Sequence, residues 1–97
     1  MGLKSLAASK HFQSQLKKLP LQERQKVTDV LKKFLSALNS GAIPHGLGFK
    51  KINGDKYEIR VDIRKRIVMK AEGDTLVCHL MGDHEEVRRY LRNYRNK

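Results

Sequence analysis

The sequence predicts an α+β domain: a three- to four-stranded antiparallel β-sheet, covered by an N-terminal helical hairpin and followed by a C-terminal helix. Up to residue 40 the apolar residues recur with the 3.6-residue period of amphipathic helices, whereas from residue 57 they recur with the period of 2 typical of strands. A helical pattern returns after residue 83. The 97 residues suffice for one domain and not for two, so residues 1–97 are expected to form a single domain.

The first helix is expected to begin after Ser9, a good N-cap residue, and to end at Pro20, which cannot continue a helix. Phe12, Leu16 and Leu19 recur at i, i+4 and i+7, so they share one helical face.

The second helix is expected to begin near Gln22 and to stop at residues 39–41 (Asn-Ser-Gly). Its apolar stripe is wide enough to cover a core. The stripe consists of Val27, Val30, Leu31, Phe34, Leu35 and Leu38. The short link between the two helices implies an antiparallel helical hairpin.

Three strands are predicted at residues 57–64, 66–71 and 75–81, with a turn at residues 53–55 before the first of them. In the first strand, apolar residues alternate with polar ones, which predicts one buried and one exposed face. The alternating apolar residues are Tyr57, Ile59, Val61 and Ile63. Residues 3–8 give a weak signal for a further short strand, because alanine is a poor strand former.

A C-terminal helix is predicted from Asp83, because Asp83 and Glu86 have the spacing of a capping box. Its apolar stripe is Val87, Tyr90, Leu91 and Tyr94.

The charge balance is strongly basic, with 21 Lys and Arg against 10 Asp and Glu and a formal net charge of +11. Such an excess on a short chain indicates a polyanion or an acidic protein as partner. The plain alternative is that the charge only keeps the protein soluble.

The sequence also predicts location and excludes several chemistries. The single cysteine, Cys78, cannot form an intramolecular disulfide, and its apolar neighbours predict a buried, inert thiol. No stretch is long and apolar enough to span a membrane, and no signal-peptide core is present, so the cytoplasm is expected. The four histidines lack the spacing of a metal motif and no Gly-rich phosphate loop occurs, so neither a metal nor another cofactor is expected.

Basic residues are concentrated between positions 50 and 70, where they outnumber the acids Asp55, Glu58 and Asp62. The basic residues are Lys50, Lys51, Lys56, Arg60, Arg64, Lys65, Arg66 and Lys70. A patch of this kind can contact phosphates and can stabilise the charge that develops when a phosphodiester is cleaved. A solvated strand face is the simpler interpretation of the same residues.

His84 is expected in the first turn of the last helix, directly after the third strand. The positive end of a helix dipole disfavours the imidazolium form, so a neutral histidine there can accept a proton as a general base. Taken alone, such a histidine is more often ordinary polar surface.

Several stretches resemble the RelE superfamily of bacterial toxins: residues 57–61 (YEIRV), 66–69 (RIVM) and 76–87 (LVCHLMGDHEEV). In that family a strand ends in an arginine-apolar-apolar step, and the next strand closes in Gly-x-His or Gly-x-Arg before a short helix. Residues 9–12 (SKHF) and 16–20 (LKKLP) resemble the first helix of the family and its Leu-Pro stop. The resemblance covers nearly the whole chain and implies a RelE-like fold.

The resemblance also implies a function. Most members of the family are ribosome-dependent messenger-RNA endonucleases, held inactive in a hetero-oligomer by an acidic antitoxin. A minority, the ParE-like toxins, inhibit DNA gyrase instead.

The resemblance assigns roles by position. Arg66 matches the arginine that contacts the scissile phosphate, and Arg60 falls where a basic residue lines the cleft. His84 matches a position that is histidine in some members and arginine in others. Glu58 lies near a position that is basic in some members and would be a second acid-base group. His45 resembles a histidine that some members place before the first long strand.

Two departures concern the proton donor for the leaving group. The aromatic residue that several members place after the Gly-x-His element would fall near Arg88. Tyr90 is close to it but belongs to the apolar stripe, and the last helix is longer than the family's short tail. The donor therefore stays open between Tyr90, Arg88 and another group.

The expected function is metal-independent cleavage of mRNA in the ribosome. His84, or Glu58, would take the proton from the RNA 2′-hydroxyl, and Arg66 with Arg60 would stabilise the charge on the phosphorane. The residues expected to hold the RNA are Lys50, Lys51, Arg64, Lys65 and Arg88. A gyrase-inhibiting toxin and a non-enzymatic, basic nucleic-acid-binding module are the alternatives.

Overall fold

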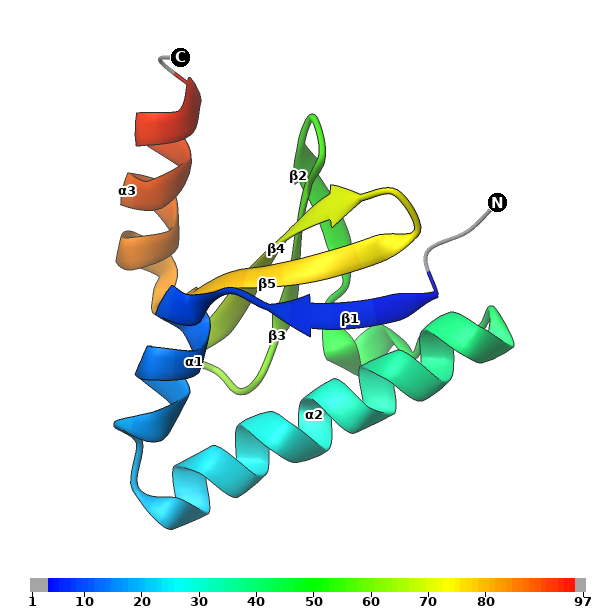
Figure 1. The fold of residues 1–97 in the computed structure, drawn as a ribbon, viewed down its shortest axis with the longest axis horizontal. Helices are drawn as coiled ribbons and strands as arrows, with labels where there is room; N and C mark the ends of the chain where they lie inside the picture. The colour runs from blue at the N-terminus through cyan, green and yellow to red at the C-terminus, as the bar shows by residue number, and fades with distance from the viewer. Residues whose placement is uncertain (1–3, 96–97) are drawn as a thin grey trace.

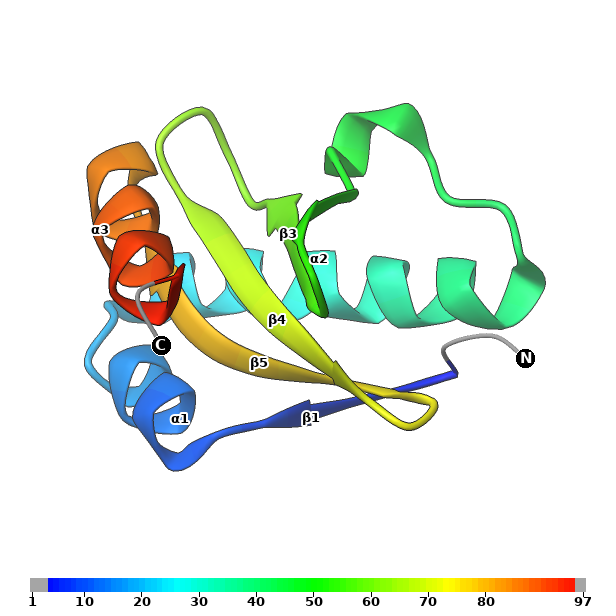
Figure 2. The ribbon, with the colours of Figure 1, turned by 90° about the horizontal axis from the view of Figure 1, so that it is seen from above.

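A single mixed β-sheet runs through the part of the chain that the computed structural model describes, residues 4–95 (Figures 1 and 2). The elements follow one another as β1 (Ser5–Ala8), α1 (Lys10–Lys17), α2 (Leu21–Ser40), the 3₁₀ turn η1 (His45–Leu47), β2 (Lys50–Asn53), β3 (Lys56–Arg60), β4 (Arg66–Glu72), β5 (Thr75–Gly82) and α3 (His84–Arg95). This order confirms the predicted α+β class with its C-terminal helix.

The sheet has five strands in the order β1-β5-β4-β3-β2, instead of the three or four predicted, and it is not wholly antiparallel. β1 pairs with β5 in parallel, and the other neighbours are antiparallel. β2 was missed because its Lys50 and Lys51 are exposed, so this edge strand shows no apolar alternation. The weak signal at residues 3–8 corresponds to β1, and its predicted start at Leu3 lies outside the described residues.

The two N-terminal helices cover the same face of the sheet. Phe12 of α1 and Phe34 of α2 are fully buried in one cluster with Ile59, Ile67 and Leu76 of the sheet. The helices do not lie side by side as a close hairpin: α1 packs against β5 and α2 against β1, and Figure 1 shows them diverging from their short link. The predicted helical cover is therefore present, but it is splayed.

The predicted strand over residues 57–64 ends early, at Arg60. The Oδ1 atom of Asp62 accepts the backbone N–H groups of Arg64 at 2.9 Å and Lys65 at 2.8 Å, and these bonds turn the chain. As a result Ile63 is 86% exposed, although the alternation assigned it to the buried face. A local side-chain hydrogen bond here overrides the apolar pattern.

α3 begins with the predicted capping box. The Asp83 N–H donates to Glu86 Oε1 at 2.8 Å, and the Glu86 N–H donates to Asp83 Oδ1 at 2.9 Å. The helix packs against β4 and β5 and buries Val87. Tyr90 is half-buried, and the side chain of Tyr94 lies outside the described part of the structure.

Cys78 is buried in the core, as predicted, and burial raises the pKa of its thiol to about 12. The thiol is therefore protonated and unreactive in the folded protein. Between residues 4 and 95, no helix has the length and apolar character that a membrane crossing requires.

Candidate active site

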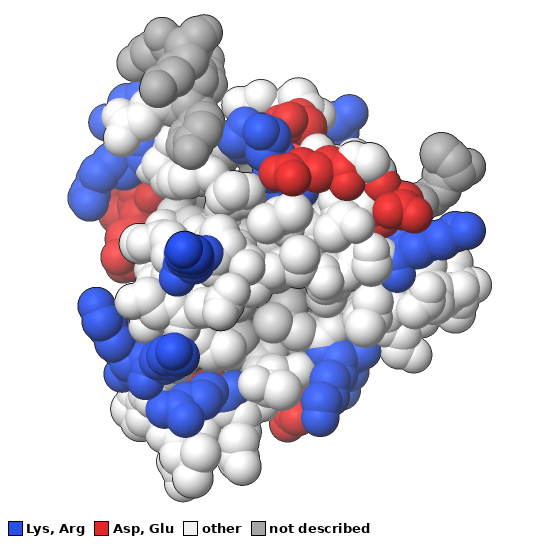
Figure 3. Space-filling model, in the orientation of Figure 1, with Lys and Arg blue, Asp and Glu red and all other residues white. Residues whose placement is uncertain are grey.

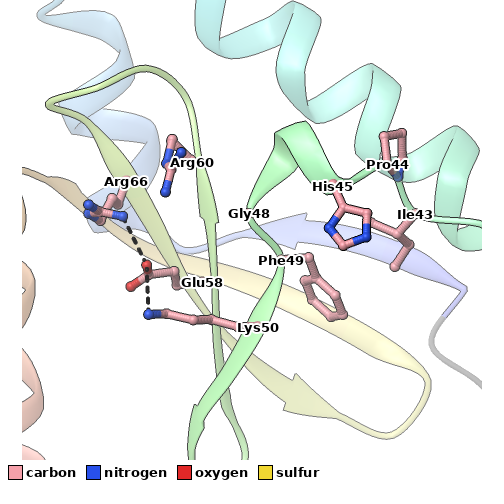
Figure 4. Close-up of a pocket in the computed structure, with 9 residues that line it drawn as sticks. All are labelled: Ile43, Pro44, His45, Gly48, Phe49, Lys50, Glu58, Arg60 and Arg66. Carbon is pink, nitrogen blue, oxygen red and sulfur yellow. Dashed lines mark hydrogen bonds and ion pairs between the residues drawn. The ribbon is translucent and has the colours of Figure 1, made fainter.

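A pocket with a volume of about 320 Å³ opens where β2, β3 and β4 meet the segment that follows α2 (Figure 4). It is lined by Ile43, Pro44, His45, Gly48, Phe49, Lys50, Glu58, Arg60 and Arg66. The register of the sheet explains part of this set: Lys50 pairs with Glu58, and Arg60 pairs with Arg66. Because side chains alternate along strands, these four charged groups share the face that α1 and α2 leave uncovered.

Glu58 lies at the centre of the charged part of the pocket and is only 6% exposed. Its Oε2 atom is 3.2 Å from Arg66 Nη1 and 3.9 Å from Lys50 Nζ. A buried carboxylate is costly unless it is paired, and here two cations provide the pairing. The pocket therefore combines a fixed carboxylate with an excess of positive charge.

Arg66 has hydrogen-bonding capacity to spare. Its Nη1 atom donates to Glu58, whereas its buried Nε has no partner within the described residues. A buried N–H without an acceptor is unfavourable, so the Nε–H group of Arg66 would readily donate a hydrogen bond to an anion in the pocket. This is the arrangement expected of an arginine that receives a phosphate oxygen.

Arg60 extends along the η1 turn at Gly48. Gly48 has φ of +60°, and a Cβ atom added to it would lie 3.3 Å from Arg60 Cβ and 3.7 Å from Arg60 Nε. The glycine thus provides both the left-handed backbone and the space that the arginine side chain occupies. No sequence pattern predicts that residue 48 lies against Arg60.

An aromatic stack supports the opposite wall of the pocket. The Phe49 ring lies parallel to the Tyr57 ring, with centroids 5.4 Å apart, and its centroid is 5.0 Å from that of Phe34 in the core. These contacts fix the start of β2 relative to α2. Figure 4 shows His45 and Phe49 across the pocket from Arg66. No spacing in the sequence identifies Phe49 as part of a site, because a single phenylalanine is typical of the hydrophobic core.

The structure brings together four of the predicted site residues, Lys50, Glu58, Arg60 and Arg66, and adds His45. His84 does not line this pocket. It is exposed at the start of α3, two residues after Gly82, the backbone partner of Arg66.

The other predicted RNA-binding residues lie elsewhere. Arg64 and Lys65 line a separate groove between α1 and the start of α3, and Lys65 Nζ is 3.1 Å from Glu23 Oε1. Lys51 is exposed on the edge strand β2, and Arg88 is exposed on α3. Among the side chains that the structure describes, no three His, Cys, Asp or Glu groups gather in a way that could hold a metal ion.

The chemical groups of the pocket suit a phosphodiester. Lys50, Arg60 and Arg66 supply positive charge for the phosphate, and the carboxylate of Glu58 can accept a proton. His45 adds an imidazole, a group that can accept or donate a proton.

Comparison with solved structures finds the same fold in several known proteins. No family model and no curated protein matches the chain. Solved structures do match: a chain of the RelB–RelE antitoxin–toxin complex from Methanococcus jannaschii has 23% identity and a TM-score of 0.63, with 87% of this chain and 96% of that chain covered. A chain of the DinJ–YafQ toxin–antitoxin complex from E. coli has 17% identity and a TM-score of 0.63, with 88% and 97% covered.

A chain of the YoeB–YefM complex from Staphylococcus aureus is similar at 16% identity and a TM-score of 0.60, with 81% of this chain and 94% of that chain covered. These likenesses span almost the full length of each matched chain. The protein therefore has the fold of the RelE-type toxins, as the sequence resemblance implied.

Proposed function

We propose that the protein is the toxin of a toxin–antitoxin pair and cleaves messenger RNA in the ribosome without a metal ion. The observation that carries the proposal is the pocket in which Glu58 is held by Arg66 and Lys50 beside Arg60. A buried carboxylate surrounded by cations on a RelE-like fold has the groups needed for proton abstraction and for charge stabilisation.

The proposed reaction uses the RNA's own nucleophile. Glu58 takes the proton from the 2′-hydroxyl, and the oxygen attacks the neighbouring phosphorus. The bond from phosphorus to the 5′-oxygen breaks, which leaves a 2′,3′-cyclic phosphate on one fragment. His45, across the pocket, gives a proton to the departing 5′-oxygen, and Arg66 and Arg60 stabilise the phosphorane. His84 is the alternative base, and it would have to reach the RNA from outside the pocket.

Three variants test this reaction in a translation mixture, with primer extension on the template message. Glu58→Gln should lower the cleavage rate by about 10²–10⁴-fold if Glu58 is the base. Arg66→Ala should lower it by about 10²–10³-fold. His84→Ala changes an exposed side chain, so it should alter stability by about 0.5 kcal/mol or less and should leave most of the activity.

A thermal unfolding curve for each variant separates lost chemistry from lost fold. If His84→Ala abolishes cleavage and Glu58→Gln does not, the base is His84. If Glu58→Gln and Arg66→Ala both still arrest growth, with messages intact and DNA supercoiling changed, the nuclease proposal is wrong and a gyrase-directed toxin takes its place.

The proposal includes a partner and a location. The net charge of +11 favours an acidic protein, and the similar structures named above are complexes of a toxin with an antitoxin. We therefore propose an acidic antitoxin that forms a hetero-oligomer with this protein in the cytoplasm, where its mRNA and ribosome targets are found.

A further inference from the structure

A second and larger groove lies directly beside the candidate active site. It runs between the C-terminal half of α2 and residues 42–47 and ends at β3, with a volume of about 660 Å³. Its lining residues include Lys33, Ser36, Ala37, Leu47, Arg60 and Val61. Apart from Arg60, no residue that lines this groove takes part in the proposed cleavage reaction.

The two cavities adjoin at Arg60. Arg60 and Pro44 line both of them, so the arginine side chain stands on the boundary between the groove and the active-site pocket. The contact with Gly48 keeps the arginine stem close to the η1 turn. An RNA strand that crosses this boundary would contact the Arg60 guanidinium with the nucleotides on either side of it.

The chemistry of the groove suits a nucleotide. Its floor is apolar, with Ala37 and Leu47 buried and Val30 and Val61 half-buried. Its charged lining residues are both cations, Lys33 and Arg60, and no carboxylate lines it. An apolar floor can contact a base and ribose, and two cations with no acid nearby can contact the flanking phosphates.

We propose that this groove is a second nucleotide subsite, which holds the nucleotide next to the scissile phosphate while Lys33 contacts the phosphate beyond it. The inference rests on the proposed RNA substrate and specifies where the strand continues. The positive charge suits either RNA or an acidic peptide, but the continuity with the candidate active site at Arg60 favours single-stranded RNA as the occupant.

Two adjacent lysines of α2 provide the test. Lys33 lines the groove, whereas Lys32 lines a different one between α1, α2 and β1, and both are exposed. Lys33→Ala and Lys32→Ala thus remove the same charge from neighbouring positions. The probe is a 2′-O-methyl RNA trinucleotide, which cannot be cleaved, and its affinity is measured over a range of salt concentrations.

Lys33→Ala should weaken binding and reduce the salt slope by about 0.7, the value for one phosphate contact of a single strand. Lys32→Ala should leave the slope unchanged. A nucleoside 3′-monophosphate, which fits the active-site pocket alone, should bind both variants as it binds the wild type. Equal effects of the two substitutions on the trinucleotide would overturn the inference, as would the absence of any RNA binding.

A second pair of substitutions tests whether the RNA needs the open volume of the groove. Ser36→Leu places a larger side chain in the groove, and Ser14→Leu makes the same change at an exposed position of α1 that lines neither cavity. Only Ser36→Leu should remove the gain in affinity from mononucleotide to trinucleotide. If an acidic peptide is displaced by Ser36→Leu and the RNA is not, the groove binds protein and the inference is wrong.

The cleavage assay is independent of these measurements. RNA bound through Lys33 but never cut would refute the proposed nuclease and leave the subsite standing. Cleavage that is indifferent to Lys33 and Ser36 would refute the subsite alone.

Discussion

At the scale of single residues, Glu58 and Arg66 together determine what the pocket can bind. Glu58 neutralises one of the three cations that line the pocket, and Arg66 Nε, which has no hydrogen-bond partner among the described residues, remains available. The pocket therefore stays net positive even with its carboxylate ionised. This balance lets the pocket keep a buried acid and still attract an anion such as the proposed RNA.

Gly48 is the residue whose replacement separates backbone strain from the placement of Arg60. Gly48→Ala and Gly73→Ala both introduce a side chain at positive φ, +60° and +66°, but only at position 48 is there a neighbour within 4 Å, namely Arg60. Each substitution should lower the free energy of unfolding by about 1–2 kcal/mol, measured by urea denaturation.

Only Gly48→Ala should also lower RNA cleavage, by up to about a hundredfold, because Arg60 must shift away from the new methyl group. In an Arg60→Ala background the second substitution should have no further effect on cleavage. An equal loss of cleavage in Gly48→Ala and Gly73→Ala would mean that strain alone, and not Arg60, is responsible.

At the scale of elements, the β3–β4 loop depends on one carboxylate. Partial burial of Asp62 opposes its ionisation, but the backbone N–H groups of Arg64 and Lys65, together with Lys26, outweigh this and lower its pKa. A carboxyl with a lowered pKa stabilises the fold at pH values above its unfolded pKa, and this contribution is lost as pH falls through the folded pKa.

Asp62→Ala should therefore cost about 1–3 kcal/mol of unfolding free energy at pH 7, and the difference from wild type should shrink in acid below about pH 4. Asp62→Asn keeps an oxygen acceptor and should recover part of the loss without the pH dependence. Urea denaturation at pH 7 and at pH 3 measures both effects. A wild-type advantage that is the same at the two pH values would contradict the assigned role of the ionised carboxylate.

The elements also show what the sequence can and cannot predict. α3 was predictable because its capping box is local, and the same holds for the end of α2, where Gly41 adopts φ of +83°. The end of β3 was not, because the hydrogen bonds of Asp62 compete with an apolar pattern that continues to Ile63.

The site was predictable where register follows from alternation, as it does for Glu58, Arg60 and Arg66. The rest of the pocket depends on how the segment from Ile43 to Phe49 folds back over β3, and no periodicity encodes that return. The distance of His84 from the pocket likewise depends on where β5 ends, which is a property of the assembled sheet.

At the scale of the whole molecule, positive charge dominates but is unevenly spread. On the face that Figure 3 shows, Lys and Arg are gathered toward the side where α1 and α3 lie. Asp and Glu are more frequent toward the β4–β5 turn. A charge of +11 on 97 residues creates self-repulsion that an acidic partner relieves. The proposed antitoxin and the proposed RNA substrate would then compete for the same positively charged surface.

We expect the proposed acidic antitoxin to raise the thermal midpoint of this protein when the two are mixed. A partner present at a hundred times its Kd adds about 2.7 kcal/mol to the unfolding free energy. Differential scanning calorimetry at low and high salt measures the gain and the electrostatic share of it. An unchanged midpoint at stoichiometric excess would remove the support for an antitoxin.

The parallel pairing of β1 with β5 determines how late in synthesis the sheet can be completed. Ser5 is paired with Thr75, so the first strand waits for seventy further residues before its neighbour has been made. Because the tunnel of the ribosome hides the most recently added residues, β1 stays without its neighbour in the sheet until β5 has emerged from the tunnel.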